Sequence, residues 1–215
     1  MHTCHSTFSL SGHTLHRVDF DATTFSDDDL RWLPAPPNFS RAVVKRKAEH
    51  LAGRLAAFYA LQAHGIEHIA GTGDCRQPLW PYGWYGSISH CGSSALATVA
   101  KMPVGVDIEK IIDAGHCEEI TPGIIGALER EVLDACGLDF PLGLTLAFSA
   151  KESLYKALSF RLSHIPEFSA AEVIHCGSDS LTLRLNAGFH PALAGETCHL
   201  PWQQIDERVV TLALA

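Results

Sequence analysis

The sequence predicts an α+β fold made of two similar lobes, each a long helix packed on a small, mainly antiparallel sheet. Three observations carry this prediction. Each half of the chain contains one long stretch with helical apolar spacing, over residues 40–63 and 142–160. Short strand-like segments gather around these two helices instead of alternating with many helices. Pro103 lies near the join, so the predicted lobes are residues 1–103 and 104–215.

The first half is dominated by one helix. A weakly alternating segment at residues 13–20 predicts a strand, and Ser26–Leu30 predicts a helix start with an acidic first turn. The clearest helix covers residues 40–63, where Ser40 can cap the start and Gly65 can end it. Its apolar stripe recurs at steps of three and four: Val44, Ala48, Leu51, Leu55, Phe58 and Leu61.

Two loops and a hairpin complete the predicted N-terminal lobe. Three prolines mark a loop at residues 34–37, and glycine and proline mark another at residues 71–83. Residues 87–90 and 95–100 then predict the two strands of a hairpin, with residues 91–94 as its turn.

The second half has a similar content. A strand follows Pro103 and carries Asp107 and Glu109. Helices are expected over residues 123–136 and 142–160. The remaining segments predict four strands, near residues 171–175, 181–186, 196–203 and 208–214.

Composition excludes several classes of protein. The net charge of −8 argues against binding to a nucleic acid. The seven cysteines are odd in number and form no C-x-x-C pair, so neither a disulfide framework nor a zinc ribbon is predicted. No signal-peptide pattern and no membrane-spanning apolar run occurs in the sequence. We therefore expect a cytoplasmic monomer.

Two acidic segments indicate a site for a cation and a phosphate. Asp107 and Glu109 fall on one face of a strand, because strand side chains alternate. Glu152 and Lys156 fall on one face of a helix, because they are four residues apart. Each segment alone is typical of a solvated surface. Together, three carboxylates and a lysine can hold Mg²⁺ and a phosphorylated substrate.

A basic helix face gives the second candidate site. Arg46, His50 and Arg54 recur at steps of four along the helix predicted over residues 40–63. This pattern fits a solvated basic edge or a phosphate-binding face, and the spacing alone leaves both open.

Four ordered motifs resemble those of the 4'-phosphopantetheinyl transferases. They are Trp80-Pro81, Gly86–Cys91, Gly105–Glu109 and Phe148–Lys156. The order of all four makes the resemblance specific, and Gly12–His16, Lys45–Lys47 and Glu49–Arg54 strengthen it toward members that serve siderophore synthesis. It covers residues 12–160 well and becomes vague in the last 55 residues.

The resemblance implies an activity, a fold and a set of partners. Members of this family transfer the phosphopantetheine arm of coenzyme A to a serine of an apo carrier domain, release adenosine 3',5'-bisphosphate and require Mg²⁺. The implied fold has its active site between the two lobes. The implied clients are peptidyl or aryl carrier domains of a synthetase.

The resemblance also implies residue roles. Asp107, Glu109 and Glu152 would bind Mg²⁺, and Glu152 would act as general base on the carrier serine, directly or through water. Lys156 and Lys151 would clamp the phosphate under attack. Contacts to coenzyme A are implied for Arg46, Arg54, Arg76, Ser89 and His90, with the two helix arginines on the 3'-phosphate. His90 is also implied in catalysis as a donor to a coenzyme A phosphate.

One departure from the family weakens one of these roles. Some members carry a lysine directly before the proline of the loop motif, whereas this chain has Gln77 before Pro78. Arg76 is the candidate replacement.

Three alternatives remain at the level of sequence. The same chemistry could act on a fatty-acid carrier protein, and sequence does not show the carrier-binding surface. A non-catalytic carrier-domain or nucleotide-binding module would require a broken carboxylate set, but all three carboxylates are intact. Another Mg²⁺ phosphotransferase would be expected to carry a G-x-x-x-x-G-K-[ST] loop, which the sequence lacks.

Overall fold

The computed structural model describes the chain as two compact units, Met1–Val104 and Gly105–Ala215. The boundary lies one residue from the predicted one. The described residues are 1–31, 33, 39–73 and 76–215. The loop predicted at residues 34–37 and the Asp74-Cys75 part of the loop motif lie outside them.

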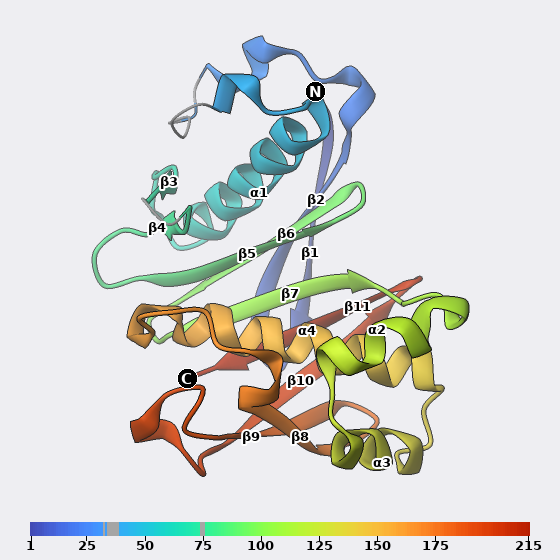
Figure 1. Cartoon of the computed structure of the whole chain (residues 1–215). Helices are drawn as coiled ribbons and strands as arrows, with labels where there is room; N and C mark the ends of the chain where they lie inside the picture. Colours follow the sequence, from blue (N-terminus) through green and yellow to red (C-terminus); the bar gives the residue numbers. More distant parts are fainter. Residues whose placement is uncertain (32, 34–38, 74–75) are drawn as a thin grey trace. The chain divides into compact units, whose positions relative to one another are not determined.

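The N-terminal unit is a four-stranded antiparallel sheet with one long helix against it (Figure 1). The strand order is β1-β2-β6-β5, and the helix is α1 (Val44–Gln62), which contacts β2, β5 and β6. The strands are β1 (His2–Leu10), β2 (His13–Asp21), β5 (Tyr85–Cys91) and β6 (Ser94–Ala100), and a separate ribbon pairs β3 (Gly71–Thr72) with β4 (Pro78–Leu79). Short 3₁₀ turns occupy Ala22–Thr24, Asp27–Leu30 and Phe39–Arg41.

Small side chains let α1 lie close to its sheet. The buried residues of this interface are mostly alanines: Ala48, Ala52, Ala56 and Ala57 from the helix, and Ala95 and Ala97 from the sheet. Because alanine side chains are short, the helix backbone approaches the strands closely, and the polar residues at the start of α1 keep fixed positions relative to β5.

The C-terminal unit is a five-stranded sheet of order β7-β11-β10-β9-β8. Helix α4 (Phe140–Leu158) packs on β11, while α3 (Ala127–Ala135) lies against β8 and α2 (Cys117–Ile124) against α4 (Figure 1). The strands are β7 (Val104–Lys110), β8 (Ala171–Cys176), β9 (Ser180–Leu185), β10 (Thr197–Ile205) and β11 (Arg208–Leu214). Short 3₁₀ turns occupy Ala114–His116, Ser159–Arg161, Phe168–Ala170 and Pro191–Leu193.

The small polar residues of the Phe148–Lys156 motif hold α4 on β11. Ser149 and Ser153 bond to the hydroxyl of Thr211 at 2.9 and 2.7 Å, and Ser153 Oγ also donates to the Thr211 carbonyl at 3.0 Å. All three residues are fully buried. Gly105 lets β7 lie close to α4, since a Cβ atom at this position would meet the backbone nitrogen of Ala157 at 2.6 Å.

The α+β prediction is confirmed, and so is the location of both long helices. The helix predicted over residues 123–136 is wrong. The chain instead forms α2 and α3, separated by extended backbone at Ile125 and Gly126. Pro122 lies inside α2, and the break follows Ile124. Helix α1 begins at Val44, with Val43 as the N-cap residue, rather than at the predicted Ser40.

Three strands were not predicted. Strand β1, with an exposed face, pairs with β2 through a turn in which Ser11 and Gly12 both have positive φ, as a two-residue hairpin turn requires. Strands β3 and β4 have two residues each, too few for a periodic signal. No helix among the described residues is long and apolar enough to cross a membrane.

Candidate active site

The centre of the acidic site is an ion pair between β7 and α4. Lys156 Nζ lies 2.6 Å from Asp107 Oδ1 and donates to the carbonyl of Val106 at 3.3 Å. Asp107 is almost fully buried, whereas about a quarter of the Lys156 side chain is exposed. The pair therefore presents its lysine to solvent, and its carboxylate is held in a fixed position by β7.

Glu152 belongs to the same electrostatic group. It lies one helical turn before Lys156 on α4. Burial raises the pKa of the Glu152 carboxyl, Lys156 lowers it, and Asp107 raises it again. Asp107 and Glu152 are thus two interacting carboxylates near one ammonium group, that of Lys156. An added cation would favour the ionised form of both carboxylates.

Asp107 and Glu152 fit a Mg²⁺ ion by the chemistry of their donors. Mg²⁺ commonly takes one or two carboxylates and completes its shell with water and substrate phosphate. The part of the chain that the structure describes holds no group of three or more metal-ligating side chains. Glu109 is half-buried near the end of β7, and its role as a third ligand stays a prediction.

Lys151 points elsewhere. It is buried on α4, and its Nζ lies 2.6 Å from Glu129 Oε1. It also donates to the carbonyls of Ile124 and Phe168, at 2.8 and 3.0 Å. Burial lowers the pKa of the Lys151 ammonium, and Glu129 raises it. The structure thus brings Lys156 to Asp107 but places Lys151 in a separate buried cluster.

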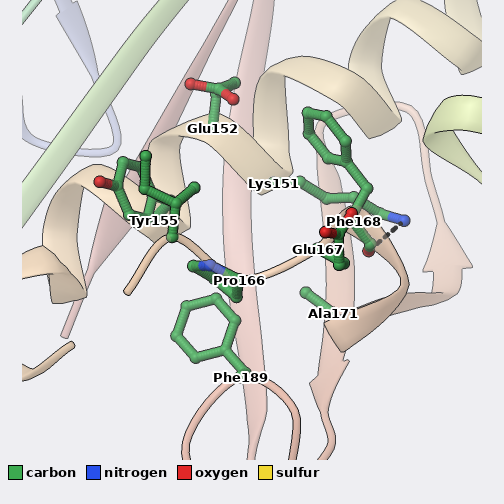
Figure 2. Close-up of a pocket in the computed structure, with 9 residues that line it drawn as sticks. Lys151, Glu152, Tyr155, Pro166, Glu167, Phe168, Ala171 and Phe189 are labelled. Carbon is green, nitrogen blue, oxygen red and sulfur yellow. Dashed lines mark hydrogen bonds between the residues drawn. The ribbon is translucent and has the colours of Figure 1, made fainter. Parts of the chain in front are cut away.

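A pocket of about 70 Å³ opens beside Glu152 (Figure 2). Helix α4 supplies Lys151, Glu152 and Tyr155, and the chain that follows the helix supplies the opposite wall. The remaining lining residues are mostly apolar: Ile165, Pro166, Glu167, Phe168, Ala171 and Phe189. This pocket offers an apolar surface next to the candidate base.

The N-terminal unit carries the second predicted group. Arg46 Nη1 donates to Nε2 of His90 at 2.9 Å, because a guanidinium has no acceptor. Glu49 lies beneath both, 3.7 Å from Arg46 Nη1 and 3.9 Å from His90 Nδ1. The structure therefore brings Arg46 and His90 together, although they are 44 residues apart in sequence.

Arg54 lies on the same basic face of α1 as Arg46, but in a different environment. It is buried, its Nη2 donates to Thr72 Oγ1 at 2.8 Å, and burial lowers its pKa to about 10. Between the arginines, burial and the charges of Arg54, Arg46 and His90 lower the pKa of His50 to about 4. His50 is thus neutral at pH 7, and its Nε2 has no hydrogen-bond partner among the described residues. Burial is the largest cause of this neutrality, and the two guanidinium groups beside it make this face positive, which suits an anion.

Ser89 and Arg76 are not part of this basic face. Ser89 alternates with His90 on β5, so it lies on the opposite face of the sheet from His90 and α1. Arg76 is exposed and has a positive φ of 64°. Their predicted contacts to coenzyme A stay predictions.

Sequence reasoning missed three contributors. Glu129 gave no signal, since it lies 22 residues before Lys151 in a segment predicted as uninterrupted helix. Thr72 falls in the loop predicted at residues 71–83, where nothing distinguishes it. Most of the pocket wall comes from residues 165–168, a segment after α4 without helical or strand periodicity.

Known proteins resemble both units. Residues 35–100 match the 4'-phosphopantetheinyl transferase N-terminal domain, and residues 103–213 match the 4'-phosphopantetheinyl transferase superfamily. The chain is 48% identical over 215 residues to enterobactin synthase component D of Salmonella typhi, which covers 100% of this chain and 92% of that protein.

Two further relatives extend the comparison. Enterobactin synthase component D of Escherichia coli (strain K12) is 52% identical over 157 residues, 73% of this chain and 76% of that protein. The 4'-phosphopantetheinyl transferase Npt of Nocardia iowensis is 34% identical over 153 residues, 64% of this chain and 67% of that protein.

Proposed function

The chain belongs to the 4'-phosphopantetheinyl transferase superfamily, and from this premise we propose that it activates carrier domains for the synthesis of an enterobactin-type siderophore. It transfers the phosphopantetheine arm of coenzyme A to a carrier serine and releases adenosine 3',5'-bisphosphate. The single observation that supports this best is the group formed by Asp107, Glu152 and Lys156, because it places a candidate base and a cation beside one another.

The reaction needs one bond to form and one to break. The serine oxygen attacks the pyrophosphate phosphorus nearer pantetheine, and the bond from that phosphorus to the oxygen of the nucleotide side breaks. Glu152 accepts the serine proton, directly or through water. Lys156 binds a phosphate oxygen and offsets the charge that accumulates on it. Asp107 holds Lys156 in position.

Asp107, Glu152 and Glu109 would hold the Mg²⁺ ion. When bound, Mg²⁺ supplies positive charge to the pyrophosphate oxygens and stabilises the leaving bisphosphate. The mutual repulsion of Asp107 and Glu152 supports this assignment, because a cation relieves it.

The basic face of the N-terminal unit suits the nucleotide end of coenzyme A. Arg46, Arg54 and His90 supply donors for the 3'-phosphate, and forked guanidinium donors match phosphate geometry. Ser89 and Arg76 are further proposed contacts to coenzyme A.

The pocket beside Glu152 suits the pantetheine arm. The arm is attached to the phosphorus under attack, so it must lie near Glu152 when the reaction starts. Apolar walls from Pro166, Phe168 and Phe189 can bury its dimethyl group, which contributes about 0.8 kcal/mol for each buried carbon.

Peptidyl and aryl carrier domains of a siderophore synthetase are the proposed clients. The relatives named enterobactin synthase component D favour this class over fatty-acid carrier protein. We further propose that the protein acts as a monomer in the cytoplasm and can associate peripherally with a membrane-bound synthetase complex.

Mass spectrometry of an apo carrier domain tests the reaction. After incubation with the protein, coenzyme A and Mg²⁺, the carrier should gain the mass of one phosphopantetheine group on its serine. A carrier with that serine replaced by alanine should gain nothing, and chelation of Mg²⁺ should stop the transfer. An unchanged wild-type carrier would exclude the proposed reaction.

Kinetics on two carriers then test the client. We expect a higher kcat/KM on a peptidyl or aryl carrier domain than on an apo fatty-acid carrier protein. The reverse order would overturn the siderophore assignment but leave the transferase chemistry intact.

A further inference from the structure

Lys151 and Glu129 form a buried ion pair in the C-terminal unit. The two residues are 3% and 4% exposed. A lysine ammonium has three N–H donors. All three have partners here: Glu129 Oε1, the Ile124 carbonyl and the Phe168 carbonyl.

Both oxygens of the Glu129 carboxylate also accept hydrogen bonds. Its Oε1 accepts the backbone N–H of Val173 at 2.9 Å as well as the Lys151 ammonium. Its Oε2 accepts the backbone N–H of Gly126 at 2.8 Å, which caps the start of α3. The pair thus joins five elements: the end of α2, the start of α3, α4, the turn at Phe168–Ala170 and β8.

The direction of Lys151 follows from helix geometry. Residues 151 and 156 are five positions apart, which is about 140° around a helix. Lys156 faces Asp107, so Lys151 faces the opposite side, toward α3 and the turn that carries Phe168. To reach a phosphate, Lys151 would have to leave Glu129 as an uncompensated buried charge. That loss exceeds what one new charge-assisted hydrogen bond returns.

Lys151 also connects the two sides of the pocket. It lies directly before Glu152 in sequence, and its Nζ holds the carbonyl of Phe168 (Figure 2). Phe168 lines the wall opposite α4. The distance between the candidate base and this wall therefore depends on the buried pair.

We propose that Lys151, paired with Glu129, is a positioning residue that fixes the pocket wall at Phe168 relative to Glu152, rather than a ligand of a coenzyme A phosphate. This inference rests on the proposed function, because the pocket is assigned there to the pantetheine arm. It also replaces the phosphate-clamp role that the family resemblance implies for Lys151.

Three variants separate positioning from phosphate binding: Lys151→Met, Glu129→Gln and the double variant. In folded protein, each single change should lower kcat/KM for coenzyme A roughly 10- to 100-fold, as substitutions of supporting residues commonly do. The double variant removes both buried charges, and glutamine keeps an acceptor oxygen for the cap of α3. It should recover most of the activity lost in Lys151→Met.

The competing roles give different patterns. If Lys151 binds a phosphate, Glu129→Gln should retain activity, and the double variant should be as impaired as Lys151→Met. If the pair is merely structural, the folded single variants should keep the wild-type kcat/KM. Inhibition by adenosine 3',5'-bisphosphate adds a second readout. It should be nearly unchanged in all three variants, since this product lacks the pantetheine arm.

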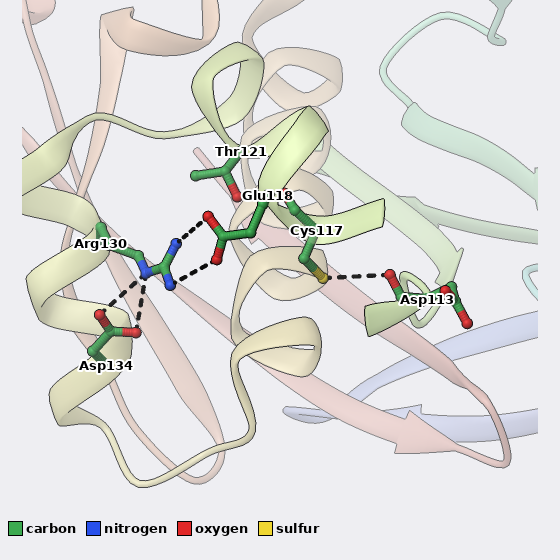
Figure 3. Close-up of polar contacts among 6 residues, drawn as sticks. All are labelled: Asp113, Cys117, Glu118, Thr121, Arg130 and Asp134. Carbon is green, nitrogen blue, oxygen red and sulfur yellow. Dashed lines mark hydrogen bonds and ion pairs between the residues drawn. The ribbon is translucent and has the colours of Figure 1, made fainter. Parts of the chain in front are cut away.

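An exposed network offers the matched control. Arg130 of α3 reaches α2 by its ion pair with Glu118 at 3.1 Å and also pairs with Asp134 of its own helix at 3.1 Å (Figure 3). Its guanidinium lies over the ring of Phe140. Glu118→Gln weakens this exposed connection between the same helices and leaves Lys151 and Glu129 in place. Its kcat/KM should equal that of the wild type.

Amine acylation of the wild-type protein keeps the proposal testable even if the variants do not fold. Lys45, with 74% of its side chain exposed, should react under native conditions. Lys151 should stay unmodified with or without coenzyme A. Acylation of Lys151 in the native protein at a rate near that of Lys45 would overturn the proposal. This measurement needs no transfer, so it is independent of whether the wild type modifies a carrier.

Discussion

The two units hold the charged residues of their candidate sites in different environments. In the N-terminal unit, Arg46 and His90 lie at a partly exposed surface, where half of the Arg46 side chain is open to solvent. In the C-terminal unit, Asp107 and Lys151 are buried and held by specific partners. The comparison teaches that helical spacing finds the exposed group from sequence, whereas only the packing tells which buried charge supports the fold and which faces a substrate.

The first prediction concerns the buried carboxylates and carries the largest expected effect. Asp107→Ala or Glu152→Ala should lower kcat/KM for carrier modification by about 10²–10⁴-fold, because each removes a charge that the transition state uses. Steady-state kinetics on protein of verified fold is the measurement. Glu119→Gln, an exposed carboxylate on α2, is the control and should retain activity. Turnover near that of the wild type in either alanine variant would refute the Mg²⁺ and base assignments together.

The sequence predicted most of the regular structure for identifiable reasons. The apolar stripe over residues 44–61 is a strong periodic signal, and α1 forms there, although it begins at Val44 rather than Ser40. The strand predicted after Pro103 also forms, as β7. The sequence could not reveal the break between α2 and α3, because Gly126 is capped by Glu129 through a side chain that also pairs with Lys151. The same tertiary contact hid the difference between Lys151 and Lys156, which look alike in the motif.

The second prediction compares one glycine from each unit. Gly105→Ala should destabilise the C-terminal unit by about 3 kcal/mol, because its Cβ would meet the backbone of α4 at Ala157. Gly53→Ala on α1 should have a much smaller effect, since its Cβ would meet a movable methyl group, Ile88 Cγ2, at 2.8 Å. The gain in helix propensity of up to about 1 kcal/mol also offsets that contact.

Denaturant unfolding of both variants measures the difference. Gly123→Ala is the control, because it lies within α2 and its Cβ would meet nothing within 4 Å. Equal losses of unfolding free energy at Gly105 and Gly53 would contradict the difference in packing between the two units.

The third prediction tests the basic face of the N-terminal unit. Arg46→Ala and Arg54→Ala should each weaken the binding of coenzyme A by roughly 1.5–3 kcal/mol, the usual value of a hydrogen bond to a charged group. Binding of 3'-dephospho-coenzyme A should change less, because it lacks the phosphate that these residues contact. Isothermal titration calorimetry with both ligands measures the difference between their losses of affinity. If both ligands lose affinity equally, the residues form a solvated basic edge and the proposed 3'-phosphate contact is wrong.

The last prediction concerns acid sensitivity of the N-terminal unit. His16 is buried, and its Nδ1 lies 3.1 Å from His5 Nε2. Burial, with smaller contributions from His5 and His64, lowers the pKa of His16 from 6.5 to about 4. Between these values the unfolded chain binds a proton at His16 that the folded chain does not, so stability falls as the pH drops from 6.5 to 4.

The size of this loss can be isolated by substitution. His16 should contribute roughly 1–2 kcal/mol of the stability that the wild type loses between pH 7 and pH 5, below the limit set by its full pKa shift. His50 has the same lowered pKa of about 4, so His16→Leu removes one of two titrating groups and should reduce the pH dependence over that range by about half, whatever its effect on stability at pH 7. Urea unfolding at both pH values gives the comparison. Parallel losses in the variant and the wild type would show that other groups in the N-terminal unit carry the acid sensitivity.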